Sequence, residues 1–139
     1  MLQVGDRFPL ERLSVQPEGP AVVYFYPAAM TPGCTMESKG FSDRYQRFRD
    51  AGYEVIGVST DAAEKNDEFR ATCDLVFPIH SDEEEKLTRE LGLLKDYGEY
   101  GWHAHRMTYL LDADGIVQRI WDVDDAAAHP DEVLAAVTE

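Results

Sequence analysis

The sequence predicts an α/β fold, with a mixed central sheet flanked by helices on both faces. Short apolar runs rich in β-branched and aromatic residues alternate with longer segments of helical periodicity, which is typical of parallel strands joined by crossover helices. Near the end of the chain, Asp114-Gly115 separates two strand-like runs and indicates an antiparallel hairpin. Crossovers followed by a hairpin require a mixed sheet, and a length of 139 residues suits one domain over 1–139.

Five runs are predicted to be strands, because each is short, apolar and bounded by turn residues. They cover residues 21–26, 54–59, 76–80, 106–112 and 116–123. Pro27 ends the first of these strands, since proline cannot donate a hydrogen bond to a ladder. The segment from Gly98 to His103 follows neither period and is expected to be a loop.

Four segments are predicted to be helices. They cover about 32–50, Asp61 to about Thr72, Ser81 to about Leu91, and a C-terminal stretch that starts at Pro130. In the first segment, Phe41, Tyr45 and Phe48 recur on one face, and Gly52 follows as the terminating residue. Two helices begin with the spacing of a capping box, Asp61 with Glu64 and Ser81 with Glu84.

The composition argues against several classes of function. A formal net charge of −14 gives an acidic surface that repels nucleic acid and anionic membranes. No apolar run approaches the ~18 residues of a membrane-spanning helix, and the first residues lack the basic and apolar regions of a secretory signal. Two cysteines without such a signal argue against a secreted disulfide scaffold. We therefore expect a cytoplasmic protein that binds neither nucleic acid nor membrane.

Cys34 is the candidate reactive group, because of the residues that precede it. The first predicted strand leads through Pro27 into Thr31-Pro32-Gly33-Cys34, with Thr31 expected as a helix N-cap and Pro32 as the first helical residue. Cys34 then lies in the first turn, where unpaired backbone N–H groups and the helix dipole favour a thiolate over a thiol. A small buried cysteine without reactivity is the alternative interpretation.

Pro27, Thr31 and Cys34 form the pattern Pro-x-x-x-Thr-x-x-Cys, and in this the chain resembles the peroxiredoxins. The string around Cys34 is most similar to the peroxiredoxin Q, or bacterioferritin comigratory, subfamily. Further segments similar to that subfamily cover 5–10, 54–59, 77–82 and 106–115, so the resemblance spans nearly the whole chain. It implies a thioredoxin-like fold and a thiol-dependent peroxidase for hydrogen peroxide and organic hydroperoxides, without a cofactor, which thioredoxin or another thiol recycles.

Peroxide reduction by a thiol requires an ionised sulfur and a stabilised leaving oxygen. Cys34 supplies the sulfur, the hydroxyl of Thr31 can lie beside it, and Pro27 can shield the site from water. The resemblance assigns the missing cation to Arg106, which we expect at the rim of a pocket, while a surface arginine is the alternative. Glu37 also matches a family position and is expected to support Arg106, rather than to act as an acid or base.

The second cysteine, Cys73, leaves two interpretations open. Many relatives carry a resolving cysteine five residues after the first, where this chain has Lys39. Other relatives carry it in the helix after the next strand, and Cys73 lies about one turn later than that pattern predicts. Cys73 is either the resolving thiol that forms a disulfide with Cys34, or a buried structural residue in a one-cysteine enzyme. The departure at Lys39 also leaves open a protein without turnover, acting as a redox sensor or a protein-binding module.

The histidines do not predict a metal site. His103 and His105 share a face if the chain is extended there, but a zinc site needs three or four ligands, and neither Cys-x-x-Cys nor Glu-x-x-His occurs. His105 is expected to line the approach to Arg106 or to be exposed. The absence of Cys-x-x-Cys also disfavours a thioredoxin-type disulfide oxidoreductase. The subfamily resemblance implies a monomer.

Overall fold

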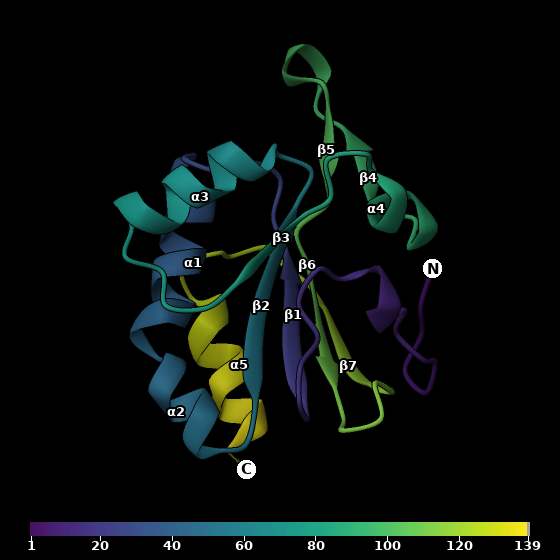
Figure 1. Ribbon diagram of the computed structural model, residues 1–139, viewed down its shortest axis with the longest axis vertical. Coiled ribbons are helices and arrows are strands. Elements are labelled where there is room, and N and C mark those ends of the chain that lie inside the picture. The colour runs from purple at the N-terminus through teal and green to yellow at the C-terminus, as the bar shows by residue number, and fades with distance from the viewer. Residues whose placement is uncertain (139) are drawn as a thin grey trace.

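A five-stranded mixed sheet with helices on both faces forms the centre of the molecule, which confirms the predicted fold class (Figure 1). The computed structural model describes residues 1–138. The strands of this sheet are β1 (Ala21–Phe25), β2 (Glu54–Ser59), β3 (Ile79–Ser81), β6 (Met107–Leu111) and β7 (Val117–Asp122). The helices are α1 (Pro32–Asp43), α2 (Tyr45–Asp50), α3 (Ala63–Thr72), α4 (Lys86–Glu90) and α5 (His129–Val137).

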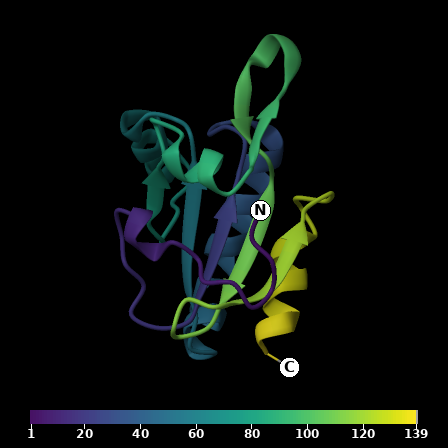
Figure 2. The same ribbon diagram turned by 90° about the vertical axis from the view of Figure 1, so that its right-hand side faces the viewer.

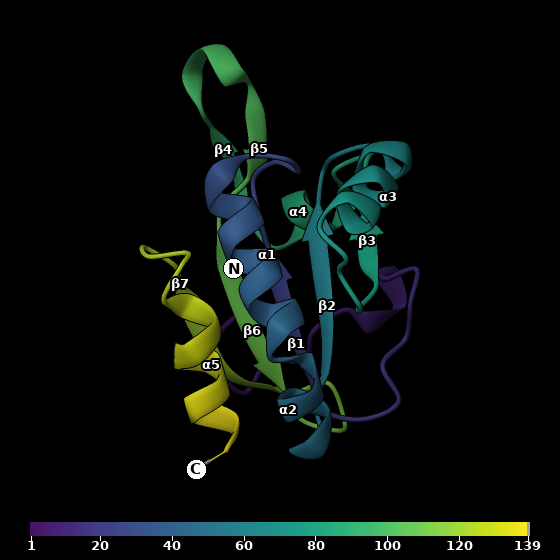
Figure 3. The same ribbon diagram turned by 90° about the vertical axis from the view of Figure 1, so that its left-hand side faces the viewer.

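The strand order β3-β2-β1-β6-β7 places β1 at the centre, parallel to β2 and antiparallel to β6. All five residues of β1 are buried, with Val22 and Tyr24 packed on one face and Val23 and Phe25 on the other. Helices α1, α2, α3 and α5 cover the first face (Figure 3), while α4 and the N-terminal segment cover the second (Figure 2). Burial on both faces explains why β1 is a continuous apolar run.

The helix predicted over about 32–50 is two helices that meet at Arg44, where φ is −103° and ψ is 3°. The Arg44 guanidinium donates to the Gly40 carbonyl and pairs with Asp131 of α5 at 2.6 Å. These contacts tie the end of α1 to α5 and let α2 start in a new direction. Phe41 and Phe48 remain buried together, with ring centroids 5.8 Å apart. The break therefore coincides with a contact to α5, which lies far away in the sequence.

Both predicted capping boxes are wrong. Helix α3 begins at Ala63 after Ala62, and the Asp61 carboxylate accepts hydrogen bonds from elsewhere, as described below. Helix α4 begins at Lys86, five residues later than expected from Ser81. Its first turn is held by the buried Asp82, whose carboxylate accepts from the amides of Leu87 and Thr88 and from the Thr88 hydroxyl. A buried carboxylate with three donors outweighs the local pattern of a Ser-x-x-Glu box.

The segment from Gly98 to His103, expected to be a loop, is part of a second hairpin. Strand β4 (Leu94–Asp96) pairs with β5 (Trp102–Ala104) around a 3-10 turn at Gly98–Tyr100. Figure 1 shows this hairpin projecting beyond the end of the main sheet. Each strand has three residues and is largely solvent-exposed, so the sequence carries no alternating apolar signal there. By contrast, the Asp114-Gly115 turn between β6 and β7 is confirmed, with φ of 80° at Gly115.

Within residues 1–138, the structure contains no helix that is both long enough and apolar enough to cross a membrane.

The Asp82 cap generates a stability prediction. Asp82→Ala leaves the first turn of α4 without its acceptor, so we expect the free energy of unfolding to fall by about 2 kcal/mol. Glu84→Ala is the matched control, because Glu84 is exposed and its surface ion pair with Lys86 is worth less than about 1 kcal/mol. Urea unfolding of the three proteins measures the difference. Equal stabilities of the two variants would contradict the role of Asp82.

Candidate active site

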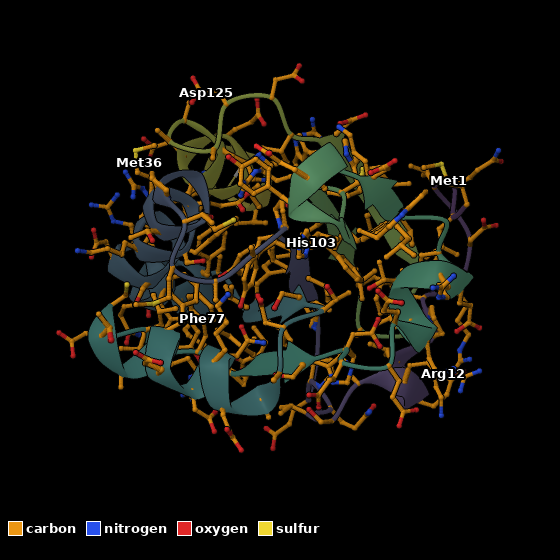
Figure 4. The ribbon with its side chains drawn as sticks, turned by 90° about the horizontal axis from the view of Figure 1, so that it is seen from above. Met1, Arg12, Met36, Phe77, His103 and Asp125 are labelled. Carbon is orange, nitrogen blue, oxygen red and sulfur yellow. The ribbon has the colours of Figure 1, made fainter. Side chains whose placement is uncertain are left out.

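Cys34 lies in the first turn of α1, at the carboxyl end of β1, as the sequence predicts. Its side chain is 1% exposed and packs in the apolar cluster beneath α1. The amides of Gly33 and Cys34 belong to the first helical turn, where N–H groups have no acceptor within the helix. Figure 4 looks down on this end of the molecule, with Met36 on one side and His103 near the centre. A buried sulfur thus lies at a helix end that favours negative charge.

Thr31 occupies the N-cap position before Pro32, with φ of −84° and ψ of 153°. Its hydroxyl donates to the Ala28 carbonyl at 2.8 Å, within the loop, and its side chain is exposed. Pro27 is half-buried between β1 and this loop. Pro27 and Thr31 are therefore close to Cys34 in the chain. The Thr31 hydroxyl donates its hydrogen to a carbonyl of its own loop and not to Cys34.

Arg106 reaches the sulfur of Cys34 from the next strand of the sheet. Its Nη2 lies 3.3 Å from Sγ of Cys34, and its Nη1 donates to Oε1 of Glu37 at 2.7 Å. The register of the sheet explains this position: Phe25 pairs with Met107, so Arg106 emerges at the end of β1 from which the chain leads to Cys34. The Arg106 side chain is 16% exposed, so most of it is shielded from solvent.

Gly33 leaves room for the Arg106 guanidinium beside Cys34. A Cβ atom at position 33 would lie 3.2 Å from Nη2 of Arg106, which is tighter than ordinary van der Waals contact. The absence of a side chain next to Cys34 leaves room for the guanidinium over the first turn of α1.

The charges of this cluster are strongly affected by burial. Glu37 is completely buried, and burial raises the pKa of its carboxyl group to about 7, against the opposing effect of Arg106. Among residues 1–138, Oε2 of Glu37 has no hydrogen-bond partner. Burial acts to lower the pKa of the Arg106 guanidinium, but the charges of Glu37 and Cys34 outweigh it and raise that pKa. Arg106 therefore stays charged, while Glu37 titrates near neutral pH.

A buried polar network, which sequence reasoning missed, holds the loop that carries Thr31. The Asp61 carboxylate accepts from the Ala29 amide at 2.7 Å and from the Ser59 hydroxyl at 2.9 Å. Behind it, Asn66 accepts from the Tyr26 hydroxyl at 2.6 Å. The same loop contains Met30 with φ of 69°, a left-handed conformation that costs energy for a residue with a side chain. A carboxylate directly after a buried strand could have indicated this role for Asp61, but its spacing to Glu64 favoured a helix cap instead.

The remaining polar residues near the site have other partners. His105 pairs with Asp122 at 2.7 Å, and His103 contacts the Tyr100 carbonyl oxygen. His129 is buried at the start of α5 against the Thr108 hydroxyl, at 2.8 Å, and was missed because a lone histidine carries no pattern. Within residues 1–138, no three histidine, cysteine, aspartate or glutamate side chains converge as metal ligands.

Cys73 is the residue directly after α3, partly buried and packed against the apolar cluster that contains Cys34. Both cysteines are free thiols in the described part of the chain. The turn after Cys73 is attached to the far end of α1, where the Ser42 hydroxyl contacts the Asp74 carbonyl and the Val76 amide. Ser42 lies eight residues beyond Cys34 in α1, so a helical rise of 1.5 Å per residue places Ser42 about 12 Å from Cys34 along the helix axis. The turn after Cys73 is therefore attached far from Cys34.

Comparisons of this chain with known proteins find a family model, related sequences and solved structures that are similar to it. A model of the AhpC/TSA family matches residues 4–120. The chain is 46% identical over 103 residues to peroxiredoxin Q, chloroplastic, of Oryza sativa subsp. japonica, covering 74% of this chain and 46% of that protein. It is 39% identical over 119 residues to peroxiredoxin Bcp of Xanthomonas campestris, covering 84% of this chain and 74% of that protein.

A solved structure of the bacterioferritin comigratory protein of Xanthomonas campestris, studied for its alkyl peroxide reduction activity, is similar over 87% of this chain and 79% of that one. The TM-score is 0.79 and the sequence identity is 36%. This chain covers between 46% and 61% of the length of the plant relatives that it matches.

The buried Glu37 carboxylate predicts a pH-dependent stability difference. Its pKa is about 7 in the folded protein and 4.5 in the unfolded chain, so its contribution is complete below pH 4.5 and is lost as the pH rises through 7. Glu37→Gln removes that cost, and we expect the reduced variant to be more stable than the wild type at pH 8 by about 3 kcal/mol, at about 1.4 kcal/mol per pKa unit. The difference should shrink as the pH is lowered to 5.

Urea unfolding at both pH values, under reducing conditions, measures this difference. Glu64→Gln is the control, because Glu64 is exposed on α3 and should give no pH-dependent difference. A wild type more stable than Glu37→Gln at pH 8 would show that pairing with Arg106 outweighs the burial of the carboxylate.

Proposed function

The chain belongs to the AhpC/TSA family and, within it, to the peroxiredoxins of the Q and Bcp type, and on that premise we propose that it is a thiol-dependent peroxidase. The observation that carries the proposal is the contact of 3.3 Å between the Arg106 guanidinium and the Cys34 sulfur. A permanent cation beside a buried sulfur favours the thiolate, which is the nucleophile in such chemistry.

The reaction is a displacement at oxygen. The Cys34 thiolate attacks one peroxide oxygen, an S–O bond forms, and the O–O bond breaks with its electron pair on the second oxygen. That oxygen takes up a proton and leaves as water or an alcohol, while Cys34 becomes a sulfenic acid. Arg106 and the first-turn amides of Gly33 and Cys34 are the donors available for the charge on the leaving oxygen.

Thr31 and Pro27 have supporting roles in this proposal. Because the Thr31 hydroxyl donates its hydrogen to Ala28, its oxygen is free to accept a hydrogen bond from the hydroxyl of the incoming peroxide. Pro27, at the end of β1, shields the sulfur from water and so strengthens the electrostatic contacts within the site. The substrates proposed are hydrogen peroxide and organic hydroperoxides, in keeping with the alkyl peroxide activity named for the Xanthomonas relative.

A thiol must reduce the sulfenic acid to complete the cycle. We propose that Cys73 forms a disulfide with Cys34, which thioredoxin or a similar thiol then reduces. The proposal requires movement, because a disulfide needs Cα atoms within about 7 Å, whereas the Cys73 turn is attached near Ser42. The first turns of α1 and the end of α3 are the segments that must open, and helix ends open most readily. Without that disulfide, the enzyme is of the one-cysteine type and an external thiol reduces Cys34 directly.

The proposal also includes the domain organisation, the oligomeric state and the cellular compartment. One domain over 1–139 carries it, of which residue 139 lies outside the described part of the chain. A net charge of −14 opposes contact between copies, which supports a monomer. Several plant relatives are named chloroplastic, while two free cysteines suit any reducing compartment, and we propose the cytoplasm for this chain.

Cys34→Ser tests the function directly, because it replaces the attacking sulfur and leaves the rest of the site in place. We expect peroxide consumption in the presence of thioredoxin or dithiothreitol to be abolished. Cys73→Ser is the matched control and should still consume one equivalent of peroxide in a single turnover. Substantial activity of Cys34→Ser would refute the assignment, and a wild type that reacts once without turnover would indicate a redox sensor.

Arg106 tests the electrostatic part of the mechanism. We expect Arg106→Lys to lower the rate of reaction with peroxide by about 100-fold, the scale for losing one charge-stabilising donor. Arg106→Ala is best measured together with Glu37→Gln, since removal of the arginine alone leaves a buried unpaired carboxylate. Arg12→Ala serves as the control, because Arg12 forms an exposed pair with Glu90. If stopped-flow measurements give Arg106→Lys the same rate of reaction with peroxide as the wild type, Arg106 does not take part in the chemistry.

A further inference from the structure

One guanidinium in this site contacts two groups that can each carry a negative charge. Arg106 contacts the Cys34 sulfur at 3.3 Å through Nη2 and the Glu37 carboxylate at 2.7 Å through Nη1. Both partners are buried, with 1% and 0% of their surfaces exposed. With both ionised, the cluster has an uncompensated negative charge in a place where charge is poorly solvated.

The groups packed around this cluster supply no further positive charge. From β1, burial raises the pKa of Tyr24 and of Tyr26, so both are neutral near pH 7. Burial also raises the pKa of Tyr97, in the β4–β5 hairpin, and lowers that of His129 at the start of α5, so both are neutral as well. Within residues 1–138, Arg106 is therefore the cation that Cys34 and Glu37 must share.

We propose that Glu37 carries a proton while Cys34 is a thiolate, and releases it when oxidation removes the charge from Cys34. The proposal rests on the peroxidase function and adds the source of the proton that the reaction consumes. Two coupled sites with one shared cation titrate as a pair, so that charge on one disfavours charge on the other. The uncontacted oxygen of Glu37, Oε2, is where the proton is held, because Oε1 accepts from Arg106.

The proton balance of the oxidation step follows from this assignment. Thiolate and peroxide give a sulfenic acid and a leaving hydroxide or alkoxide, which requires one proton. Glu37 gives up one proton as the thiolate charge disappears, and its carboxylate then pairs with Arg106 alone. The net uptake of protons from solvent at pH 7 is therefore less than one per oxidised sulfur, although the reacting sulfur starts as an anion. Glu37 acts through Arg106 and the charge of the site, as a proton store that does not contact the peroxide.

Infrared difference spectroscopy measures the proton on Glu37 through the carbonyl stretch of a protonated carboxylic acid. At pH 7, reduced wild type should show this band, and one equivalent of hydrogen peroxide should remove it. Glu37→Gln should lack the band in both states, and the matched control Glu64→Gln should behave as the wild type. Proton uptake in weakly buffered indicator solution should be clearly below one per turnover in the wild type and should rise to about one in Glu37→Gln, with the thiolate content of both proteins confirmed by ultraviolet absorbance.

A second variant tests the coupling without any peroxide chemistry. Cys34→Ser replaces the thiolate by a neutral hydroxyl, so Glu37 should be ionised at pH 7 and the band should be absent. If mass spectrometry shows oxidation of Cys34 but reduced wild type lacks the band, or keeps it after oxidation, the proton store is refuted and the peroxidase function stands. Absence of Cys34 oxidation refutes the peroxidase function instead. A band that persists in Cys34→Ser refutes the coupling in either case.

Discussion

The contact of Arg106 with both Glu37 and Cys34 is the constraint on which the rest of the site depends. It joins the start of β6 to the first turns of α1, so it requires the antiparallel register that places Met107 opposite Phe25. Glycine at position 33 also favours it, since a Cβ there would lie 3.2 Å from Nη2 and would displace the guanidinium by a few tenths of an ångström. A one-residue shift of β6 would turn its side chains to the other face of the sheet. The chemistry of Cys34 is thus tied to the pairing of two strands that are far apart in sequence.

Two features around this contact reduce the stability of the folded protein. Glu37 is buried with one oxygen lacking a partner in the described chain, and Met30 has a left-handed backbone in the loop before α1. Such features cost free energy and persist only where the neighbouring structure holds them. Asp61 is one such support, since its buried carboxylate fixes the Ala29 amide and anchors the loop to the end of β2. The loop that carries Thr31 is therefore held from the neighbouring strand as well as by its own sequence.

The two cysteines belong to parts of the fold with different stabilities. Cys34 lies in the core beneath α1, at the carboxyl end of the central strand. Cys73 lies at a helix end whose following turn is attached to α1 by the two hydrogen bonds of the Ser42 hydroxyl, both of them solvent-exposed. Exposed hydrogen bonds contribute little net free energy, so this attachment is among the first to open. Any disulfide between the two therefore depends on local unfolding. Membership of the peroxiredoxin Q and Bcp group does not by itself determine whether Cys73 forms this disulfide.

The sequence by itself determined the class of fold and the position of Cys34 in the first turn of a helix, because both depend on local patterns. The apolar run of β1, the proline after it and Thr31-Pro32-Gly33-Cys34 specify a strand, a turn and a helix start within a few residues. Tertiary structure decided which side chains complete the site. Asp61 has the spacing of a helix cap, yet Ala29 and Ser59 are its partners, and the break at Arg44 occurs where Arg44 pairs with Asp131 of α5. The raised pKa of Glu37 is likewise a property of the folded protein, because its cause is complete burial, which outweighs the opposing charge of Arg106. Local spacing does not encode such contacts, since they form between segments that only folding brings together.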